Sequence, residues 1–141
     1  MLTMQDPADG GVYHKLTNLA FDGSVMPHEA TNTRYVVQKG TSAALNFAAV
    51  MATVSRIVAP YEAQLPGYSA NALASAKRAW AWAEANPDVT YVNPSDVSTG
   101  QYGDKTLTDE WAWAAAELFA ATNDKTFLKK IDLETLPIGT P

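Results

Sequence analysis

The sequence contains no cysteine. This absence excludes disulfide-stapled scaffolds, zinc sites built on thiolates and cysteine nucleophiles. Histidine is also scarce, because His14 and His28 are the only two. They lie far apart without the spacing of metal ligands, so no zinc site is expected. Each is expected to be a loop residue that makes hydrogen bonds.

Basic charge is in short supply as well. The chain has 10 Lys and Arg against 15 Asp and Glu, a net charge of -5, and no basic run longer than Lys129–Lys130. Nucleic acids and anionic membranes attract basic surfaces, so neither is expected as a partner. No run approaches the roughly 20 apolar residues that cross a bilayer, and residues 1–5 show no signal peptide. The chain is expected to be soluble.

What the sequence does contain is chiefly helix signal. Residues 42–58 are small and apolar nearly all round, with Thr41 or Ser42 as the expected N-cap and Pro60 as the stop. A helix of this kind is normally covered on several sides. Partners for several faces are therefore expected.

A second helix is predicted from Ser69 to Asn86. Leu73, Ala76, Trp80 and Ala83 form an apolar stripe at helical spacing. At about 100° per residue, Trp82 points away from that stripe. This helix is therefore expected to be covered on two sides.

A third helix is predicted over 108–122. Thr108 is the expected N-cap, Asp109 and Glu110 in the first turn suit the helix dipole, and Asn123 is either a left-handed stop or the cap of the next helix. A short helix over 124–131 and a tail with Pro and Gly follow.

Strand signals are confined to the first third of the chain. Residues 12–17 and 35–37 are β-branched and aromatic, which favours two short strands and a small ribbon between them. The fold class predicted from these patterns is all-α with long loops and at most a short β-ribbon near residues 12–37.

Several blocks of sequence, in order and with consistent spacing over about residues 4–131, together resemble the catalytic domain of family 9 glycoside hydrolases. They are most similar to the subgroup that carries an immunoglobulin-like domain before the catalytic domain. The blocks are Gly10–Thr17, Met26–Pro27, Thr41–Ala52, Ala76–Ala83, Thr99–Asp104 and Asp109–Leu118.

The resemblance implies part of an (α/α) six-hairpin barrel, an inner ring of helices inside an outer one. A complete catalytic domain is much longer than 141 residues. Residues 1–141 are therefore expected to form a single partial domain, the middle hairpins of an incomplete toroid. Family members are secreted endoglucanases of the cellulase type, and the expected partner is a β-glucan polysaccharide or oligosaccharide.

The family hydrolyses β-1,4-glucan with inversion, using a carboxylate base and a carboxylic acid on opposite sides of the bond. In the family the base lies upstream in an Asp-Ala-Gly-Asp type motif, and the acid is a Glu near the end of the domain. Neither motif is present, and Asp9, Asp22, Asp104, Asp109 and Glu110 do not match them. No catalytic residue is therefore expected in this chain, and the chain alone should not hydrolyse glucan.

Two alternatives remain open at this point. The chain could be a non-catalytic helical module that binds glucan or protein, or one segment of an enzyme assembled from several chains. Turnover of carboxymethylcellulose by the chain alone would separate the last of these from the others.

The resemblance also implies a structural calcium ion. In related enzymes the residues that match Asp109 and Glu110 bind calcium, and Asp104 with loop carbonyls near Thr106 could add oxygens. Family ligands from beyond residue 141 would be missing, so weaker affinity is expected. The alternative is that Asp109 and Glu110 only stabilise a helix N-terminus.

Three residues are candidates for substrate binding. Tyr102, in the loop before the third helix, could stack on a sugar ring, and His14 lies in a block that borders the cleft in similar enzymes. Arg34 could donate hydrogen bonds to a sugar, although an exposed loop arginine is the alternative. Core packing is expected for the tryptophans at helical spacing, Trp80, Trp82, Trp111 and Trp113.

Two expectations concern the helix surfaces. Glu117 stands on an otherwise apolar helix and is expected to be a buried hydrogen-bonding group. Apolar faces of the helices over 42–58 and 108–122 are expected to be exposed in a partial barrel. Because exposed apolar patches drive association, self-association is predicted.

Overall fold

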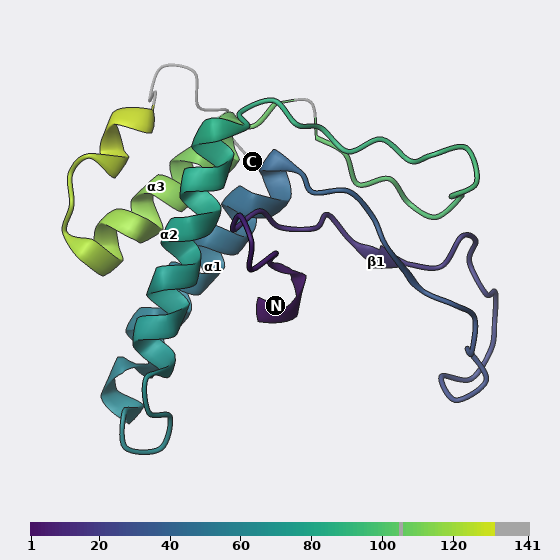
Figure 1. Ribbon diagram of the computed structural model, residues 1–141, viewed down its shortest axis with the longest axis horizontal. Helices are drawn as coiled ribbons and strands as arrows, with labels where there is room; N and C mark the ends of the chain where they lie inside the picture. The colour runs from purple at the N-terminus through teal and green to yellow at the C-terminus, as the bar shows by residue number, and fades with distance from the viewer. Residues whose placement is uncertain (105, 132–141) are drawn as a thin grey trace, which may run out of the picture.

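The computed structural model describes residues 1–104 and 106–131; the predicted tail beyond Ile131 lies outside the described residues. Three helices, α1 (Thr41–Val58), α2 (Tyr68–Ala85) and α3 (Thr108–Thr122), are joined by long loops. The helices gather on one side, and two long loops extend together on the other side (Figure 1). The prediction of a helical chain with long loops is confirmed.

Helix α1 forms the centre of the core. It packs against both α2 and α3, which make few direct contacts with each other. The prediction that α1 is covered on several sides is therefore confirmed. Its nine buried residues are Thr41, Ala44, Leu45, Phe47, Ala48, Ala49, Met51, Ala52 and Ser55.

The predicted N-caps were wrong by one residue. The N-cap of α1 is Gly40, and that of α3 is Leu107. The buried hydroxyl of Thr41 instead donates to the carbonyl oxygen of Asn86 at 2.5 Å and accepts from the N–H of Val89 at 2.9 Å. Thr41 thus bonds the start of α1 to the end of α2, a long-range use that local patterns do not reveal.

The end of α1 follows the prediction. The helix stops at Val58, and Pro60 lies in the short 3-10 turn Ala59–Tyr61 that follows. By length and composition, Thr41–Tyr61 is apolar enough to cross a membrane, with a mean hydropathy of 1.5. The prediction that no segment of the chain is long and apolar enough to cross a bilayer was therefore wrong. The burial of α1 between α2 and α3 is the pattern of a core helix.

Helix α2 is covered on two sides, as predicted. Trp80 faces the core, where its ring meets Trp111 edge to face at 5.0 Å and Phe127 at 5.4 Å. On the other side, Nε1 of Trp82 donates to the Asp9 carboxylate at 3.2 Å. Trp113 departs from the expected core packing, because it is 44% exposed.

The segment before β1 is anchored on α2. After the 3-10 turn Leu2–Met4, the buried Gln5 donates through Nε2 to the carbonyls of Gly10 and Ser75 at 2.9 and 3.0 Å. Gly10 has a φ of +83°, and a Cβ there would lie 2.8 Å from the Cβ of Arg78. A glycine is required at this point because the backbone is left-handed and touches α2.

The predicted ribbon is present but shorter than expected. Strands β1 (Leu16–Thr17) and β2 (Tyr35–Val36) pair antiparallel, with Leu16 opposite Val36. A bend at His14 interrupts the ladder, and Tyr13 pairs with Lys39 only as an isolated bridge. The predicted strand over 12–17 therefore shrinks to two residues.

Helix α3 ends as the sequence predicts, at Asn123 in the left-handed region with a φ of 57°. The predicted helix over 124–131 is a single 3-10 turn, Phe127–Lys130. On the face toward α1, Glu117 forms an ion pair with Arg56, whose charge contributes to lowering the pKa of this half-buried carboxyl. Glu117 is a hydrogen-bonding group, as expected.

Candidate functional site

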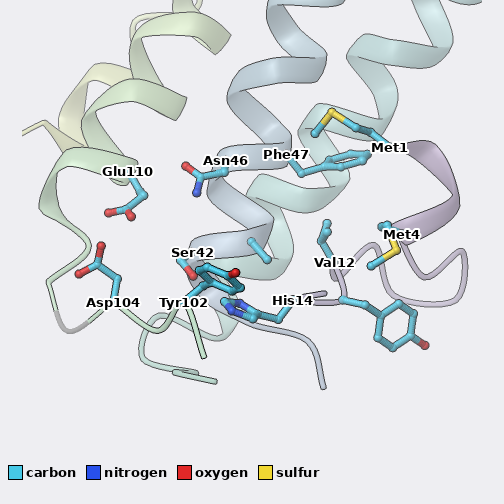
Figure 2. Close-up of a pocket in the computed structure, with 12 residues that line it drawn as sticks. Met1, Met4, Val12, His14, Ser42, Asn46, Phe47, Tyr102, Asp104 and Glu110 are labelled. Atoms are coloured by element: carbon cyan, nitrogen blue, oxygen red, sulfur yellow. The ribbon is translucent and has the colours of Figure 1, made fainter. Parts of the chain in front are cut away.

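A pocket of about 470 Å³ lies where the N-terminal segment, the first turns of α1 and the loop before α3 meet (Figure 2). This volume is within the range of small-molecule sites. Four of the candidate residues lie together here: His14, Tyr102, Asp104 and Glu110. The other lining residues are Met1, Met4, Val12, Tyr13, Ser42, Ala43, Asn46 and Phe47.

Tyr102 presents its ring to solvent at the edge of this pocket. Its side chain is 75% exposed, and its backbone is left-handed, with a φ of 53°. A non-glycine residue in this region costs energy, so its surroundings must hold it there. A Cβ at Gly100 would lie 2.7 Å from the Tyr102 ring. The ring is therefore packed directly on the Gly100 backbone.

His14 lines the pocket and is held in place through its Nε2 and its ring face. Its Nε2 lies 3.0 Å from the carbonyl oxygen of Gln101, so it is the nitrogen that donates. The ring stacks on Tyr91 with centroids 4.6 Å apart. The buried Nδ1 has no hydrogen-bond partner among the described residues. His14 thus links the ribbon to the loop that carries Tyr102.

The first turns of α1 supply a polar wall that the sequence analysis missed. Ser42 and Asn46 line the pocket, with the apolar Phe47 beside them, and Figure 2 shows Asn46 directed toward Glu110. Asn46 is an amide in the mostly apolar first half of α1. This contrast in the sequence was the available signal, and a search for polar residues on buried helices would have found it.

Glu110 is a buried carboxylate that forms no ion pair within residues 1–104 and 106–131. It is 9% exposed, and its Oε2 has no hydrogen-bond partner within the described part of the chain. Burial, with the neighbouring carboxylates of Asp109 and Asp104, raises the pKa of Glu110 to about 7. In Figure 2 the carboxylates of Asp104 and Glu110 point toward each other. A cation placed between them would relieve this charge.

The three predicted calcium ligands are only partly assembled. Asp104 and Glu110 line the pocket, whereas Asp109 is exposed on the first turn of α3. Within residues 1–104 and 106–131, no group of three or more histidine and acidic side chains is arranged to hold a metal ion. The unpartnered oxygen of Glu110 nevertheless fits the hard oxygen chemistry of calcium, which would need further oxygen ligands.

Arg34 lies outside the pocket. It is exposed and directly precedes β2, and it is not among the pocket residues. The sequence placed it near the ribbon but could not show on which side of the loops it emerges. In the structure, Tyr102 and His14 line the pocket and Arg34 does not.

Comparison with known proteins identifies the class to which this helical scaffold belongs. Residues 1–138 match the family described as "Glycosyl hydrolase family 9". The chain belongs to glycosyl hydrolase family 9.

The similar proteins are consistent with this family. A xyloglucan-specific endo-beta-1,4-glucanase of Bacteroides ovatus is 50% identical over 135 residues, which cover 90% of this chain and 23% of that protein. A solved structure named "Bacteroides ovatus GH9" aligns with a TM-score of 0.91 at 46% identity, covering 99% of this chain and 27% of that one. The structure of AaCel9A in complex with cellobiose-like isofagomine aligns with a TM-score of 0.84 at 35% identity. The alignment covers 91% of this chain and 24% of that one.

Two statements follow from these matches. The expected fold class is confirmed, since helices α1 to α3 superimpose on enzymes of a family with an (α/α) barrel. The chain spans about a quarter of the length of the relatives that it matches.

Proposed function

We propose that this chain forms one wall of the substrate cleft of an endo-type glycoside hydrolase that cleaves β-1,4-glucan by inverting hydrolysis. The observation that carries the proposal is the pocket shared by the exposed ring of Tyr102 and the polar side chains of Ser42 and Asn46. An aromatic ring offers an apolar face to a sugar, and hydroxyl and amide groups fix its orientation.

The relatives' printed names support the substrate class. One relative is called xyloglucan-specific and another structure holds a cellobiose-like ligand, and both point to a β-1,4-linked glucan backbone. Such polymers do not enter cells, so we place the parent protein outside the cell.

Hydrolysis itself is assigned to residues that this chain does not supply. Inversion needs an acid and a base about 6.5–9.5 Å apart, with room for water, and no carboxylate here matches the family's acid or base motif. We expect no reducing sugar to be released from carboxymethylcellulose by the pure chain. Clear turnover would contradict this assignment and would make Asp104 and Glu110 the first residues to substitute.

Replacing Tyr102 with alanine tests the binding proposal. We expect the chain to bind cellotetraose or a xyloglucan oligosaccharide, measured by calorimetry and by retardation in glucan-containing gels. Loss of one stacking ring is worth about 0.5–1.5 kcal/mol, so Tyr102→Ala should bind roughly two- to twelvefold more weakly.

Tyr61 provides a matched control. It is 54% exposed and lies beyond the opposite end of α1 from the pocket. Tyr61→Ala should leave the affinity unchanged. Equal losses in the two variants, or no loss in Tyr102→Ala, would remove Tyr102 from the site.

We also propose that calcium binds at the edge of the pocket, with Asp104, Asp109 and Glu110 as carboxylate ligands. The support is the buried and unpartnered Oε2 of Glu110 together with the raised pKa of that carboxyl. A bound calcium ion would neutralise the carboxylates and connect the loop before α3 to its first turn.

Thermal unfolding with and without calcium tests this site. A ligand at a hundred times its dissociation constant stabilises by about 2.7 kcal/mol, so millimolar calcium should raise the thermal midpoint. Glu110→Gln should raise the midpoint without calcium, because it removes a buried charge, and should abolish the response to calcium. An unchanged melt of the wild-type chain at millimolar calcium would exclude the site.

Self-association of the isolated chain is a further proposal. Its support is the exposure of large apolar side chains on the core helices, Ile57 at 62% on α1 and Trp113 at 44% on α3. Light scattering should report a dimer or larger species, and a stable monomer at high concentration would contradict the proposal.

A further inference from the structure

Lys15 lies between the ribbon and the loop that carries Tyr102. Its ammonium donates to the Asn93 side-chain oxygen at 3.0 Å, the Thr99 hydroxyl at 3.1 Å and the Gly100 carbonyl at 2.6 Å. An ammonium group has three donors, so all three are used on one loop. Lys15 therefore connects residues about 80 positions apart in the sequence, and hydrogen bonds from a charged donor are stronger than neutral ones.

The same ammonium lies near the two tyrosine rings at the pocket edge. It is 5.2 Å from the centroid of Tyr91, on which His14 stacks, and 5.9 Å from the centroid of Tyr102. Cations attract the faces of aromatic rings at such distances. Lys15 is thus placed to act on both the supporting ring and the exposed ring.

No carboxylate forms an ion pair with Lys15 within the described ranges, in contrast to Lys39 on the same ribbon. Burial lowers the pKa of Lys15. A lysine that is desolvated without a counter-charge is costly to keep for stability alone, since its contacts are all neutral. Its hydrogen bonds go instead to the loop that leads to Tyr102, at the side-chain oxygens of Asn93 and Thr99 and the backbone carbonyl of Gly100.

The backbone at Tyr102 needs such support. Its left-handed conformation is unfavourable for a residue with a side chain, and its ring rests on Gly100. Lys15 binds the Gly100 carbonyl, and Asn93 reinforces the loop by donating to the Thr99 carbonyl at 2.6 Å. Lys15 thus adds three bonds to this segment, which His14 also holds at the Gln101 carbonyl and Thr17 at the Thr99 hydroxyl.

We propose that Lys15 is a positioning residue for the pocket: by binding three oxygens of the 93–102 loop it holds the Tyr102 ring in the orientation that meets a sugar. This inference rests on the proposed glucan-binding function. Lys15 acts through Tyr102 and does not itself touch the substrate.

Hydrogen exchange tests the positioning without any ligand. Lys15→Met keeps an apolar stem and removes the donors, and amide exchange over residues 93–103 should become roughly tenfold faster while α1, α2 and α3 keep their protection. Lys39→Met is the matched control, since Lys39 lies on the same ribbon and contacts Asp6, Asp9 and the Tyr13 ring. It should leave exchange over 93–103 unchanged. An unchanged loop in Lys15→Met, or a uniform increase over the helices, would overturn the proposal.

A double-mutant cycle with cellotetraose tests the link to binding. Lys15→Met alone should weaken affinity as much as Tyr102→Ala, and it should add no further loss in the Tyr102→Ala background. Additive losses would show that Lys15 acts independently of Tyr102, and wild-type affinity in Lys15→Met would show that it does not act at all. If the wild-type chain binds no glucan, the proposed function fails, and the exchange experiment alone decides whether Lys15 positions the loop.

Discussion

Leu118→Ala probes the docking of α3 on α1, which brings Glu110 to the pocket. Leu118 is fully buried, at 0% exposure, and is among the largest side chains in the core. A buried Leu→Ala change costs about 2.7–5 kcal/mol, the transfer energy of the lost atoms plus the cavity left behind. For a chain of this size each kcal/mol lowers the thermal midpoint by about 3–4 °C, so the expected shift is about 8–20 °C.

Thermal and urea unfolding followed by circular dichroism at 222 nm would measure this effect. The urea midpoint should fall while the slope of free energy against urea stays constant, since the surface exposed on unfolding hardly changes. Leu65→Ala is the control, because Leu65 is 43% exposed in the turn before α2, and its cost should stay within about 0.5 kcal/mol. If both variants melted alike, α3 would not be packed on α1 as described.

Two further predictions concern the N-terminal segment. Gly10→Ala should destabilise the chain more than Gly23→Ala in urea unfolding, because both glycines have positive φ but only Gly10 meets the backbone and Cβ of Arg78; equal costs would contradict the close contact. Hydrogen bonds from Lys39, from the backbone N–H of Ala8 and from Tyr13 lower the pKa of Asp6 from 3.8 to about 2, so the stabilisation from the Asp6 carboxylate is complete above pH 4 and is lost as the pH falls toward 2. The thermal midpoint should therefore fall more steeply over that range in the wild-type chain than in Asp6→Asn, and parallel curves would refute the assignment.

The helix positions were predictable because their signals are local. The apolar pattern over 42–58 and the stop at Pro60 reproduce α1 to within one residue. The N-cap was missed because the Thr41 hydroxyl bonds to Asn86, which no short sequence window reveals. A tertiary contact, and not local helix propensity, therefore determines the role of Thr41 at the start of α1.

The candidate site was predictable only in part. The resemblance placed His14 and Tyr102 near the cleft, and the structure places both at one pocket. The burial of Glu110 and the three bonds of Lys15 depend on segments far apart in sequence. Arg34 differs from them, since it is exposed and is not among the residues that line this pocket.

The interface between α1 and α2 has a consequence for how this pocket can diversify. Alanines at 0–1% exposure lie on the buried faces of both helices, and larger side chains there would overpack the core. Ser42 and Asn46 are on the first turns of α1, so that wall of the pocket is built on a helix of the packed core. For the proposed glucan site, new sugar preferences would therefore arise by exchanging side chains or lengthening the loops opposite, because the core helices tolerate little change. These alanines are Ala44, Ala48, Ala49 and Ala52 on α1, and Ala72, Ala76, Ala79 and Ala83 on α2.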